Sequence, residues 1–463
     1  MKYSIVDYST VLENDIKRLE AEFYNSASAL TKNYYTGAEI IDFVQYGTSK
    51  ELNENKSGFP TLRLNEFESL FIKQPDKYCD KIDEDTYKSL SLKKGDVLIC
   101  RTNGNPKLVG KSAIVLKNYD YAFASYLFRI RSDKKKILPT TLVIYLNSSI
   151  GRSEIEKYLM VSNQANFSPA KFREILIPQL TENFQDEIDK LVVLSFAKNE
   201  NANSLYSQAD QILLAELNLA GWKPKHRVSF VKKYSDTGSA GRIDAEYFQP
   251  MYEQVVKKLY KYKCGYSFLG DMVNVKDNNF TPKGDVVYKY VELANISTNG
   301  NINGFTEEVG KDLPTRARRK VNAGDVIISS IEGSLESIAL INGSLNNALC
   351  STGFYVVNSE ELNSETLLVF LKTKVGQLQL KKGCSGTILT AISKDELARI
   401  VIPKIDEKIQ KEIKDKIKEM YQAKALSNEL LDIAKRSVEM AIERDERKAQ
   451  EWVNSELKKL NIR

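Results

Sequence analysis

The sequence predicts an α+β protein that contains two copies of one mixed α/β domain and two long helices. Three observations support this fold class. Short motifs recur along the 463 residues at a nearly constant offset, apolar β-rich runs recur in one order, and each copy ends in a long charged stretch of helical periodicity. At roughly 150 residues per domain, the length suffices for two domains and their connecting helices.

The repeated motifs indicate a duplication of the chain. The matched segments keep their order, and the offset between the copies stays between 224 and 229 residues. An offset that drifts and then returns indicates loops of different length inside one shared domain. The matched pairs are RLEAEFY (18–24) with RIDAEYF (242–248), GDV (95–97) with GDV (324–326), and ILIP (175–178) with IVIP (400–403).

Each copy contains short runs that are typical of strands in a compact mixed domain. The runs are apolar and are bounded by Gly, Asn, Ser and Pro. A short helix with Thr or Ser as its N-cap follows them, and the ILIP or IVIP strand closes the domain. The predicted strands are 96–100, 112–116 and 125–130 in the first copy and 286–293, 325–329, 337–341 and 353–357 in the second, and the predicted short helices are 140–148 and 364–373.

The charged stretches 183–219 and 406–458 predict long helices, because apolar residues recur at spacings of three and four with Lys and Glu between them. Helices of about 55 and 80 Å are too long for the interior of a compact domain. We expect their apolar stripes to pack as an antiparallel coiled coil that acts as a spacer, although residues 198–204 interrupt the first stripe. Two helices that each pack on their own domain are the alternative. The expected seam residues are Ile188, Leu191, Leu205, Ile212, Ile413, Ile417, Leu430 and Ile433.

The composition excludes several classes of protein. A net charge of +6 is too small for a sequence-blind DNA coat. No apolar run approaches the roughly 20 residues of a membrane span, and the start MKYSIVDYST lacks the pattern of a signal peptide, so a cytoplasmic protein is expected. The single histidine, His226, lies in a basic segment beside a proline and is expected to be a solvated loop residue. The five cysteines form no C-x-x-C pair, so neither a metal site nor a disulfide framework is expected.

One segment, 104–112, is similar to a phosphate-binding loop. It has five residues between its glycines where that loop has four, and a strand-like run follows it where that loop opens a helix. A nucleotide hydrolase that uses this loop is the alternative from the class of enzymes. The glycine-rich and N-P-P-Y-type motifs of an adenine methyltransferase are absent from the sequence. The sequence therefore predicts no catalytic residues and no cofactor.

The order and duplication of these segments resemble the specificity subunits of type I restriction-modification systems. The motifs that carry the resemblance are R-x-[DE]-A-E-[FY]-[FY] at 18 and 242, G-D-V-[LI]-I at 95 and 324, and the stretches 313–320 and 384–403. In the first copy, 162–178 lacks the S-G-T phrase of the last stretch. The resemblance implies target recognition domains at 1–181 and 223–403 and spacer helices at 182–222 and 404–463.

In function, the resemblance implies a DNA reader without chemistry of its own. Such a subunit reads a bipartite, asymmetric site in double-stranded DNA, and docks two methyltransferase subunits and, through them, restriction subunits, with no role at a membrane. The recognition subunit of a type IIB enzyme is an alternative within this class. A coiled-coil scaffold that never touches nucleic acid is the alternative outside it.

Polar loops at matching places in the two copies are the candidates for contact with DNA. Arg and Asn side chains can bind guanine and adenine edges in pairs of hydrogen bonds, Glu can accept from cytosine, and clustered basic residues fit phosphates. For each residue, an ordinary turn or solvated loop is the alternative. The candidates are Arg101, Asn103, Asn105, Lys111, Asn163, Gln164 and Asn166 in the first copy, and Arg316, Arg318, Arg319, Lys320, Ser330, Glu332, Ser334, Ser385 and Thr387 in the second.

Overall fold

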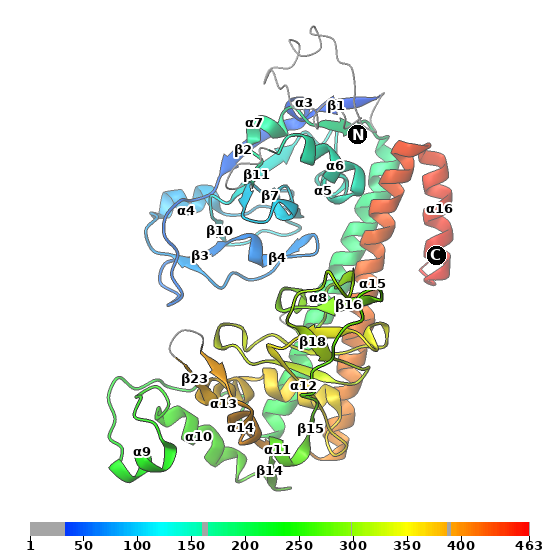
Figure 1. Ribbon diagram of the computed structural model, residues 1–463. Coiled ribbons are helices and arrows are strands. Elements are labelled where there is room, and N and C mark those ends of the chain that lie inside the picture. Colours follow the sequence, from blue (N-terminus) through cyan, green and yellow to red (C-terminus); the bar gives the residue numbers. More distant parts are fainter. Residues whose placement is uncertain (1–32, 160–164, 298, 387–389, 463) are drawn as a thin grey trace. The chain divides into compact units, whose positions relative to one another are not determined.

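The computed structural model describes residues 33–159, 165–297, 299–386 and 390–462, and the chain divides into two compact units (Figure 1). Unit 1 consists of Met1–Asn199 and Ala425–Arg463, and unit 2 consists of Glu200–Lys424. Each unit contains one mixed α/β copy together with one part of each long helix. The predicted fold class is confirmed.

Unit 1 is built on an antiparallel sheet in the order β2-β11-β7-β9. All four residues of β7 are buried, which explains why VLIC is apolar without alternation. A smaller sheet, β10-β3-β6, contains the parallel pair β10–β3. The strands are β2 (Ile41–Tyr46), β3 (Phe59–Leu62), β4 (Phe67–Glu68), β5 (Phe71–Ile72), β6 (Tyr78–Cys79), β7 (Val97–Cys100), β9 (Ser112–Ile114), β10 (Ala122–Phe123) and β11 (Leu127–Ser132), and the helix α4 is Glu84–Leu90.

Unit 2 repeats this arrangement. Its sheet β15-β22-β19-β20 has the same order of corresponding strands, and its second sheet, β17-β16-β21-β18, again contains one parallel pair, β16–β21. The structure therefore extends the duplication from the motifs to the sheet topology. The strands are β15 (Asn274–Val275), β16 (Val287–Val291), β17 (Thr306–Val309), β18 (Ala317–Lys320), β19 (Val326–Ser329), β20 (Ile338–Leu340), β21 (Leu349–Ser351) and β22 (Phe354–Asn358).

The ILIP and IVIP segments close the two copies in one register. β13 (Leu176–Pro178) pairs antiparallel with β1 (Tyr34–Thr36), and β25 (Val401–Pro403) pairs antiparallel with β14 (Tyr266–Phe268). The predicted closing strands are therefore confirmed. Short helices follow the closing pairs or cover the sheets, namely α3 (Gly37–Ile40), α5 (Pro139–Asn147), α6 (Ser149–Lys157) and α7 (Pro169–Phe172) in unit 1, and α9 (Tyr234–Ala240), α10 (Pro250–Leu259), α11 (Leu269–Met272), α12 (Ser364–Lys372), α13 (Lys374–Gly383) and α14 (Lys394–Ala398) in unit 2.

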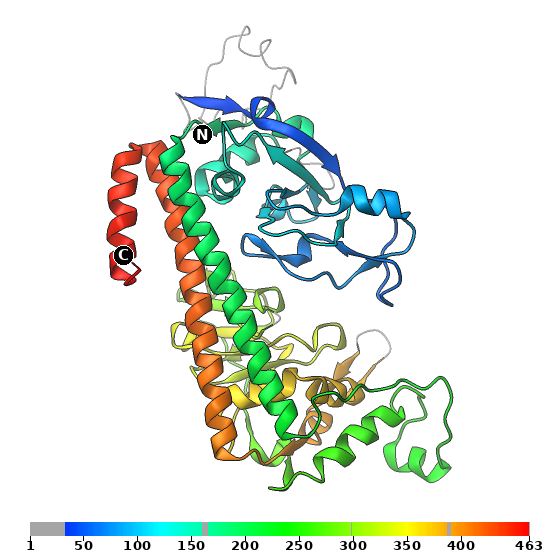
Figure 2. The same cartoon turned by 180° about the vertical axis from the view of Figure 1, so that it is seen from behind.

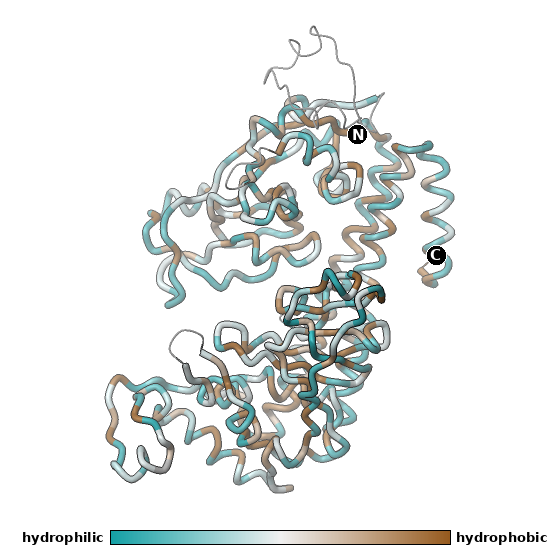
Figure 3. Tube along the Cα trace, in the orientation of Figure 1, coloured by the Kyte–Doolittle hydropathy of each residue, from teal (hydrophilic) through white to brown (hydrophobic). Residues whose placement is uncertain are grey.

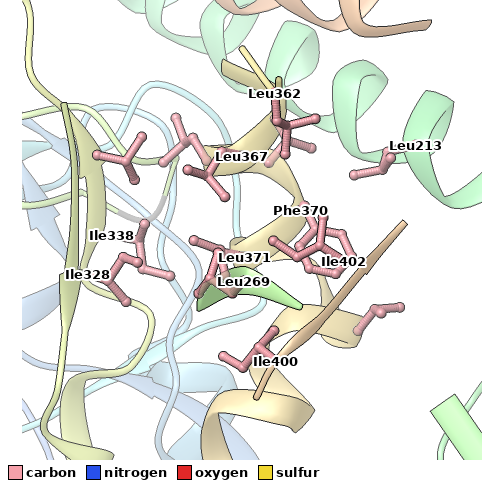
Figure 4. Packing of buried hydrophobic residues seen from close by; sticks show 14 of the residues in the cluster. Leu213, Leu269, Ile328, Ile338, Leu362, Leu367, Phe370, Leu371, Ile400 and Ile402 are labelled. Atoms are coloured by element: carbon pink, nitrogen blue, oxygen red, sulfur yellow. The ribbon is translucent and has the colours of Figure 1, made fainter. Parts of the chain in front are cut away.

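Helix α12 anchors the core of unit 2. Its side chains Leu367, Phe370 and Leu371 are fully buried, and they pack among residues of β19 and β20 such as Ile328 and Ile338 (Figure 4). Buried apolar side chains of this size each contribute about 1.5–3 kcal/mol by transfer from water. The helix is therefore a structural layer that fixes the sheet on which the loops are mounted.

The repeated G-D-V motif forms one tight turn before β7 and one before β19. Gly95 and Gly324 have φ of +95° and +90°, a conformation that glycine adopts without a Cβ penalty. The Asp96 carboxylate accepts from the backbone N–H of Lys93 at 2.8 Å, and Asp325 accepts from that of Asn322 at 2.8 Å. The motif thus recurs because the turn needs both a glycine and a carboxylate.

The two predicted long helices are present as α8 (Glu182–Glu216) and α15 (Glu407–Glu443), and apolar and hydrophilic positions alternate along them (Figure 3). The expectation of one helix through 458 is wrong. The chain leaves the helix at Arg444 and Asp445, and α16 (Glu446–Lys459) folds back (Figure 2). The Asp445 side chain accepts from Lys448 N at 2.9 Å and caps α16. The spacing of apolar residues continues through the break between α15 and α16. For this reason the sequence pattern did not predict the break.

The helices pack against each other within each unit and run antiparallel. In unit 1, Ile188 and Leu191 of α8 share a buried core with Leu430 and Ile433 of α15. Ser195 Oγ also donates to Ser427 O at 2.8 Å and Ser427 Oγ to Ser195 O at 2.9 Å. In unit 2, Leu205, Ile413 and Ile417 are buried in one core, and Ile212 packs against it. The predicted antiparallel packing of the two long helices is confirmed.

Candidate functional site

In unit 1, the structure brings the two predicted loops together. β8 (Thr102–Asn103) pairs antiparallel with β12 (Ala165–Asn166), and Phe167 N donates to Arg101 O at 2.8 Å. Arg101, Asn103 and Asn166 therefore belong to one local surface. Two further candidates in this region, Asn163 and Gln164, lie outside the described residues.

In unit 2, the corresponding loops also meet. Ser330 O accepts from Ile392 N at 2.8 Å, and Glu332 N donates to Thr390 O at 2.9 Å. Ser330 and Glu332 therefore lie against the hairpin of β23 (Cys384–Ser385) and β24 (Ala391–Ile392). Ser385 belongs to this hairpin, whereas Thr387 lies outside the described residues.

Backbone hydrogen bonds show that Arg101 and Ser330 occupy equivalent places. Arg101 N donates to Tyr126 O at 2.7 Å, and Ser330 N donates to Gly353 O at 2.9 Å. The Arg101 carbonyl accepts from Phe167 N, and the Ser330 carbonyl accepts from Ile392 N. Each residue is therefore bonded to the second polar loop of its own unit. One backbone framework thus presents a cationic side chain in unit 1 and a hydroxyl in unit 2.

The Arg101 side chain lies beside the exposed ring of Tyr46. Its guanidinium is 5.0 Å from the centroid of the Tyr46 ring, and Nη1 donates to Ser125 O at 3.4 Å. Tyr46 is 47% exposed, and Tyr126, whose carbonyl accepts from Arg101 N, is 57% exposed. Burial raises the pKa of the adjacent Cys100 thiol to about 12, so that thiol stays neutral. Tyr46 was not among the sequence candidates because β2, at whose end it lies, was not predicted.

Other polar residues of the first loop hold its turn. Asn103 Oδ1 accepts from Asn105 N at 2.8 Å, and Asn105 Oδ1 accepts from Lys107 N at 3.1 Å at the start of the 3-10 helix Pro106–Leu108. β9 follows this loop directly, so the helix that a phosphate-binding loop requires does not begin there. Partial desolvation and the Arg152 guanidinium lower the pKa of Lys111.

The serines of the second unit's loop are also engaged within the loop. Ser330 Oγ donates to Gly353 O at 2.9 Å, and the hydroxyls of Ser329 and Ser334 lie 2.9 Å apart. Glu332 is half-buried and opens the 3-10 helix Glu332–Ser334. Its side chain lines a cavity of 390 Å³, to which Arg242, Lys381 and Ser385 also contribute.

The basic cluster of β18 does not form one uniform patch. Arg316 and Lys320 are exposed, and the Lys320 ammonium is 5.8 Å from the centroid of the Phe280 ring. Arg318 Nη1 donates to Thr281 Oγ1 at 3.3 Å. Arg319, in contrast, has a buried Nη1 without a hydrogen-bond partner. Adjacent residues of a strand point to opposite faces of the sheet. The sequence prediction treated the four basic residues at five consecutive positions as one patch and did not take this alternation into account.

Among the described residues, no three His, Cys, Asp or Glu side chains gather in a way that could hold a metal ion. His226 is exposed, and its Nε2 lies 3.3 Å from Glu246 Oε2. Within the residues that the structure describes, no helix is both long and apolar enough to cross a membrane.

Residues 263–435 match the family model of the type I restriction modification DNA specificity domain. The chain therefore carries a type I specificity domain. This confirms the resemblance found in the sequence. The matched specificity domain runs from the residues before β14 into α15, so it contains Ser330, Glu332, Ser385 and the basic strand β18. Arg101 and Tyr46 lie outside it, in the unit that repeats its sheet order.

The chain is also similar to named proteins. The specificity subunit of the type I restriction enzyme StySPI from Salmonella potsdam is 30% identical over 165 residues, which cover 35% of this chain and 35% of that protein. The chain thus matches about a third of the length of this curated relative. Among solved structures, the type I S subunit of M. genitalium matches with 13% identity and a TM-score of 0.38, covering 89% and 95% of the two chains. The HsdS subunit of Thermoanaerobacter tengcongensis matches with 16% identity and a TM-score of 0.28, covering 89% and 97%.

Proposed function

We propose that this chain is the DNA sequence-specificity subunit of a type I restriction-modification complex. One observation carries the proposal. Two copies of the same framework each bring two polar loops together, and the equivalent positions hold different residues, Arg101 in unit 1 and Ser330 in unit 2. A shared scaffold with different loops is what reading two different half-sites in one duplex requires.

Each mixed domain reads one half of a bipartite, asymmetric site in double-stranded DNA. The domains are assigned to residues 1–181 and 223–403, and the helices α8 and α15 act as the spacer between them. The antiparallel packing of α8 and α15 supports this role, because a helix pair keeps a constant length between its ends.

In unit 1, Arg101 is the residue assigned to direct base contact. Its guanidinium is partly exposed, and the contact with the Tyr46 ring restricts its orientation. Arginine binds the O6 and N7 atoms of guanine in a bidentate manner, so the first half-site is expected to contain a guanine. In unit 2, Glu332 can accept from the amino group of cytosine.

The partners are inferred from the related proteins. The curated relative is named as the specificity subunit of a type I restriction enzyme. On this basis, the chain docks two methyltransferase subunits and, through them, restriction subunits, and the type IIB alternative is disfavoured. The subunit itself is a non-catalytic part of the complex, and it works in the cytoplasm.

Co-expression with its methyltransferase partner in a methylation-free host tests the proposal. Mapping of methylated bases across the genome should give one bipartite motif with two different halves, and the purified complex should retain duplex DNA. A complex that neither methylates a defined motif nor retains DNA would support the scaffold alternative. Hydrolysis of labelled ATP that disappears in Lys111→Ala would support the nucleotide hydrolase.

A further inference from the structure

The R-x-D-A-E-Y-F motif of the second copy forms a compact group of charged and aromatic contacts. Arg242 Nε lies 2.7 Å from Asp244 Oδ2, and Arg242 Nη2 donates to Asp244 Oδ1 at 3.0 Å, so the pair is bidentate. The same carboxylate accepts from Tyr247 N at 3.0 Å. The guanidinium hydrogen bonds of Arg242 hold the pKa of Asp244 below its ordinary value.

This group reaches the hairpin β23–β24. Arg242 Nη1 donates to Cys384 O at 3.1 Å, at the first residue of β23. The Arg242 guanidinium is 4.4 Å from the Tyr247 ring centroid, and the Lys382 ammonium, two residues before β23, is 4.9 Å from it. The motif therefore contacts the start of the hairpin through both a hydrogen bond and an aromatic ring.

The hairpin in turn contacts the loop at Ser330 and Glu332. The backbone hydrogen bonds from Ile392 to Ser330 and from Glu332 to Thr390 connect the two segments. A shift of the hairpin would therefore move the backbone that carries Ser330 and Glu332. Arg242, Asp244, Glu332 and Ser385 also line one cavity, which places the motif beside these loop residues.

We propose that Arg242 and Asp244, with Tyr247, are positioning residues for sequence reading by unit 2. They fix the hairpin, and the hairpin fixes the orientation of Ser330 and Glu332 toward the second half-site. This inference rests on the proposed function. Arg242 and Asp244 side chains are 24% and 45% exposed, so a role in filling the hydrophobic core does not account for the motif. The fixed fork of arginine suits the task, because a lysine has a single charged nitrogen and cannot bond Asp244 and Cys384 in the same geometry.

The test compares Arg242→Gln, Arg242→Lys and Asp244→Asn in the complex with the methyltransferase partner. Methylation of genomic sites is scored separately for single-base changes in each half of the motif. We expect all three variants to lose discrimination in the second half-site, on the order of tenfold for Arg242→Gln, and to leave the first unchanged. Arg227→Gln is the matched control, since Arg227 is exposed on the same segment and bonds Gln249 through its backbone N–H.

Thermal unfolding of each variant separates positioning from loss of fold. A wild-type unfolding temperature with a relaxed second half-site supports the proposal. Unchanged discrimination in that half, or an equal loss in both halves, overturns it. If Arg242→Gln unfolds, Asp244→Asn decides, because it keeps the size of the side chain and removes the charge. If the wild-type complex methylates no bipartite motif, the proposed function itself is refuted. This result is obtained with the wild-type complex, before any variant is made.

Discussion

The two Gly-Asp turns hold the same buried carboxylate with different cations. In unit 1, Asp96 Oδ2 lies 2.9 Å from Arg129 Nη1, and both side chains are at most 1% exposed. Asp96 Oδ1 also lies 2.6 Å from Arg131 Nε. Arg129 belongs to β11, the strand that pairs with β7. Its Nη1 also donates to Ser91 O at 2.9 Å, and its Nη2 donates to Ser89 O at 2.8 Å and to Gln45 Oε1.

In unit 2, the cation comes from a different strand. The register of β22 places Val356 where β11 has Arg129, and Asn358 where it has Arg131. Lys276, which follows the edge strand β15, supplies the charge instead, with Nζ 2.7 Å from Asp325 Oδ1. Its side chain is 34% exposed. In unit 1 the equivalent edge position is held by Gln45, the partner of Arg129 across β2 and β11.

The comparison shows that both copies have the Gly-Asp turn and a cation beside its carboxylate. The segment that supplies this cation differs between the copies. A buried carboxylate must be paired, because an isolated buried charge costs several kcal/mol. The partner can come from the adjacent strand β11, as in unit 1, or from the residue after the edge strand β15, as in unit 2.

Replacing Arg129 by the residue of unit 2, Arg129→Val, should be the most damaging change. It leaves Asp96 buried with Arg131 as its remaining cation, and we expect a loss of about 3–5 kcal/mol in the free energy of unfolding. Urea unfolding of the full chain measures it. The double variant Gln45→Lys with Arg129→Val transfers the unit 2 arrangement and should recover part of the loss. No recovery would show that the two networks are not interchangeable.

Arg101→Ala should relax sequence reading in the first half-site alone. Loss of one bidentate contact costs about 1–3 kcal/mol of discrimination, which methylation mapping with single-base variants of the site detects. Ser330→Ala, at the equivalent place in unit 2, is the paired control and should leave the first half-site intact. An effect of Arg101→Ala on the second half-site would mean that the units read DNA jointly.

Ser195→Ala should cost about 1 kcal/mol, because it leaves one buried hydroxyl and one carbonyl of the reciprocal pair with fewer partners. The residues at the matching helix positions of unit 2 are the apolar Met420 and Ala202, both buried. The double variant Ser195→Ala with Ser427→Ala should therefore be nearly neutral in urea unfolding. Additive losses from the two single changes would contradict this.

Lys276→Met should have the smallest effect, about 1 kcal/mol or less, because a partly exposed ion pair is screened by water. Asn358 Nδ2, 3.3 Å from Asp325 Oδ1, remains as a donor to the carboxylate. The measurement is again urea unfolding. A loss as large as that of Arg129→Val would erase the distinction between the two units.

The sequence was sufficient for the features that repeat along the chain. Motif offsets predicted the duplication, and periodicity predicted the closing strands and the helix seam, because each depends on local pattern. Contacts between distant segments could not be predicted in this way. The pairing of Asn103 with Ala165, the position of Tyr46 beside Arg101, and the exchange of Arg129 for Lys276 depend on strand register, which a single sequence does not specify.

The shared helices also set the order in which the protein can be completed. Unit 2 is one continuous stretch, whereas unit 1 needs the segment after residue 424. During translation, Ser195 can form its hydrogen bond with Ser427 only after a further 232 residues have been synthesised. The packing of Leu191 with Leu430 is delayed in the same way. Contacts this distant in sequence close slowly. Unit 1 therefore completes its helix pairing only after unit 2 has been translated, when α15 supplies Ser427 and Leu430.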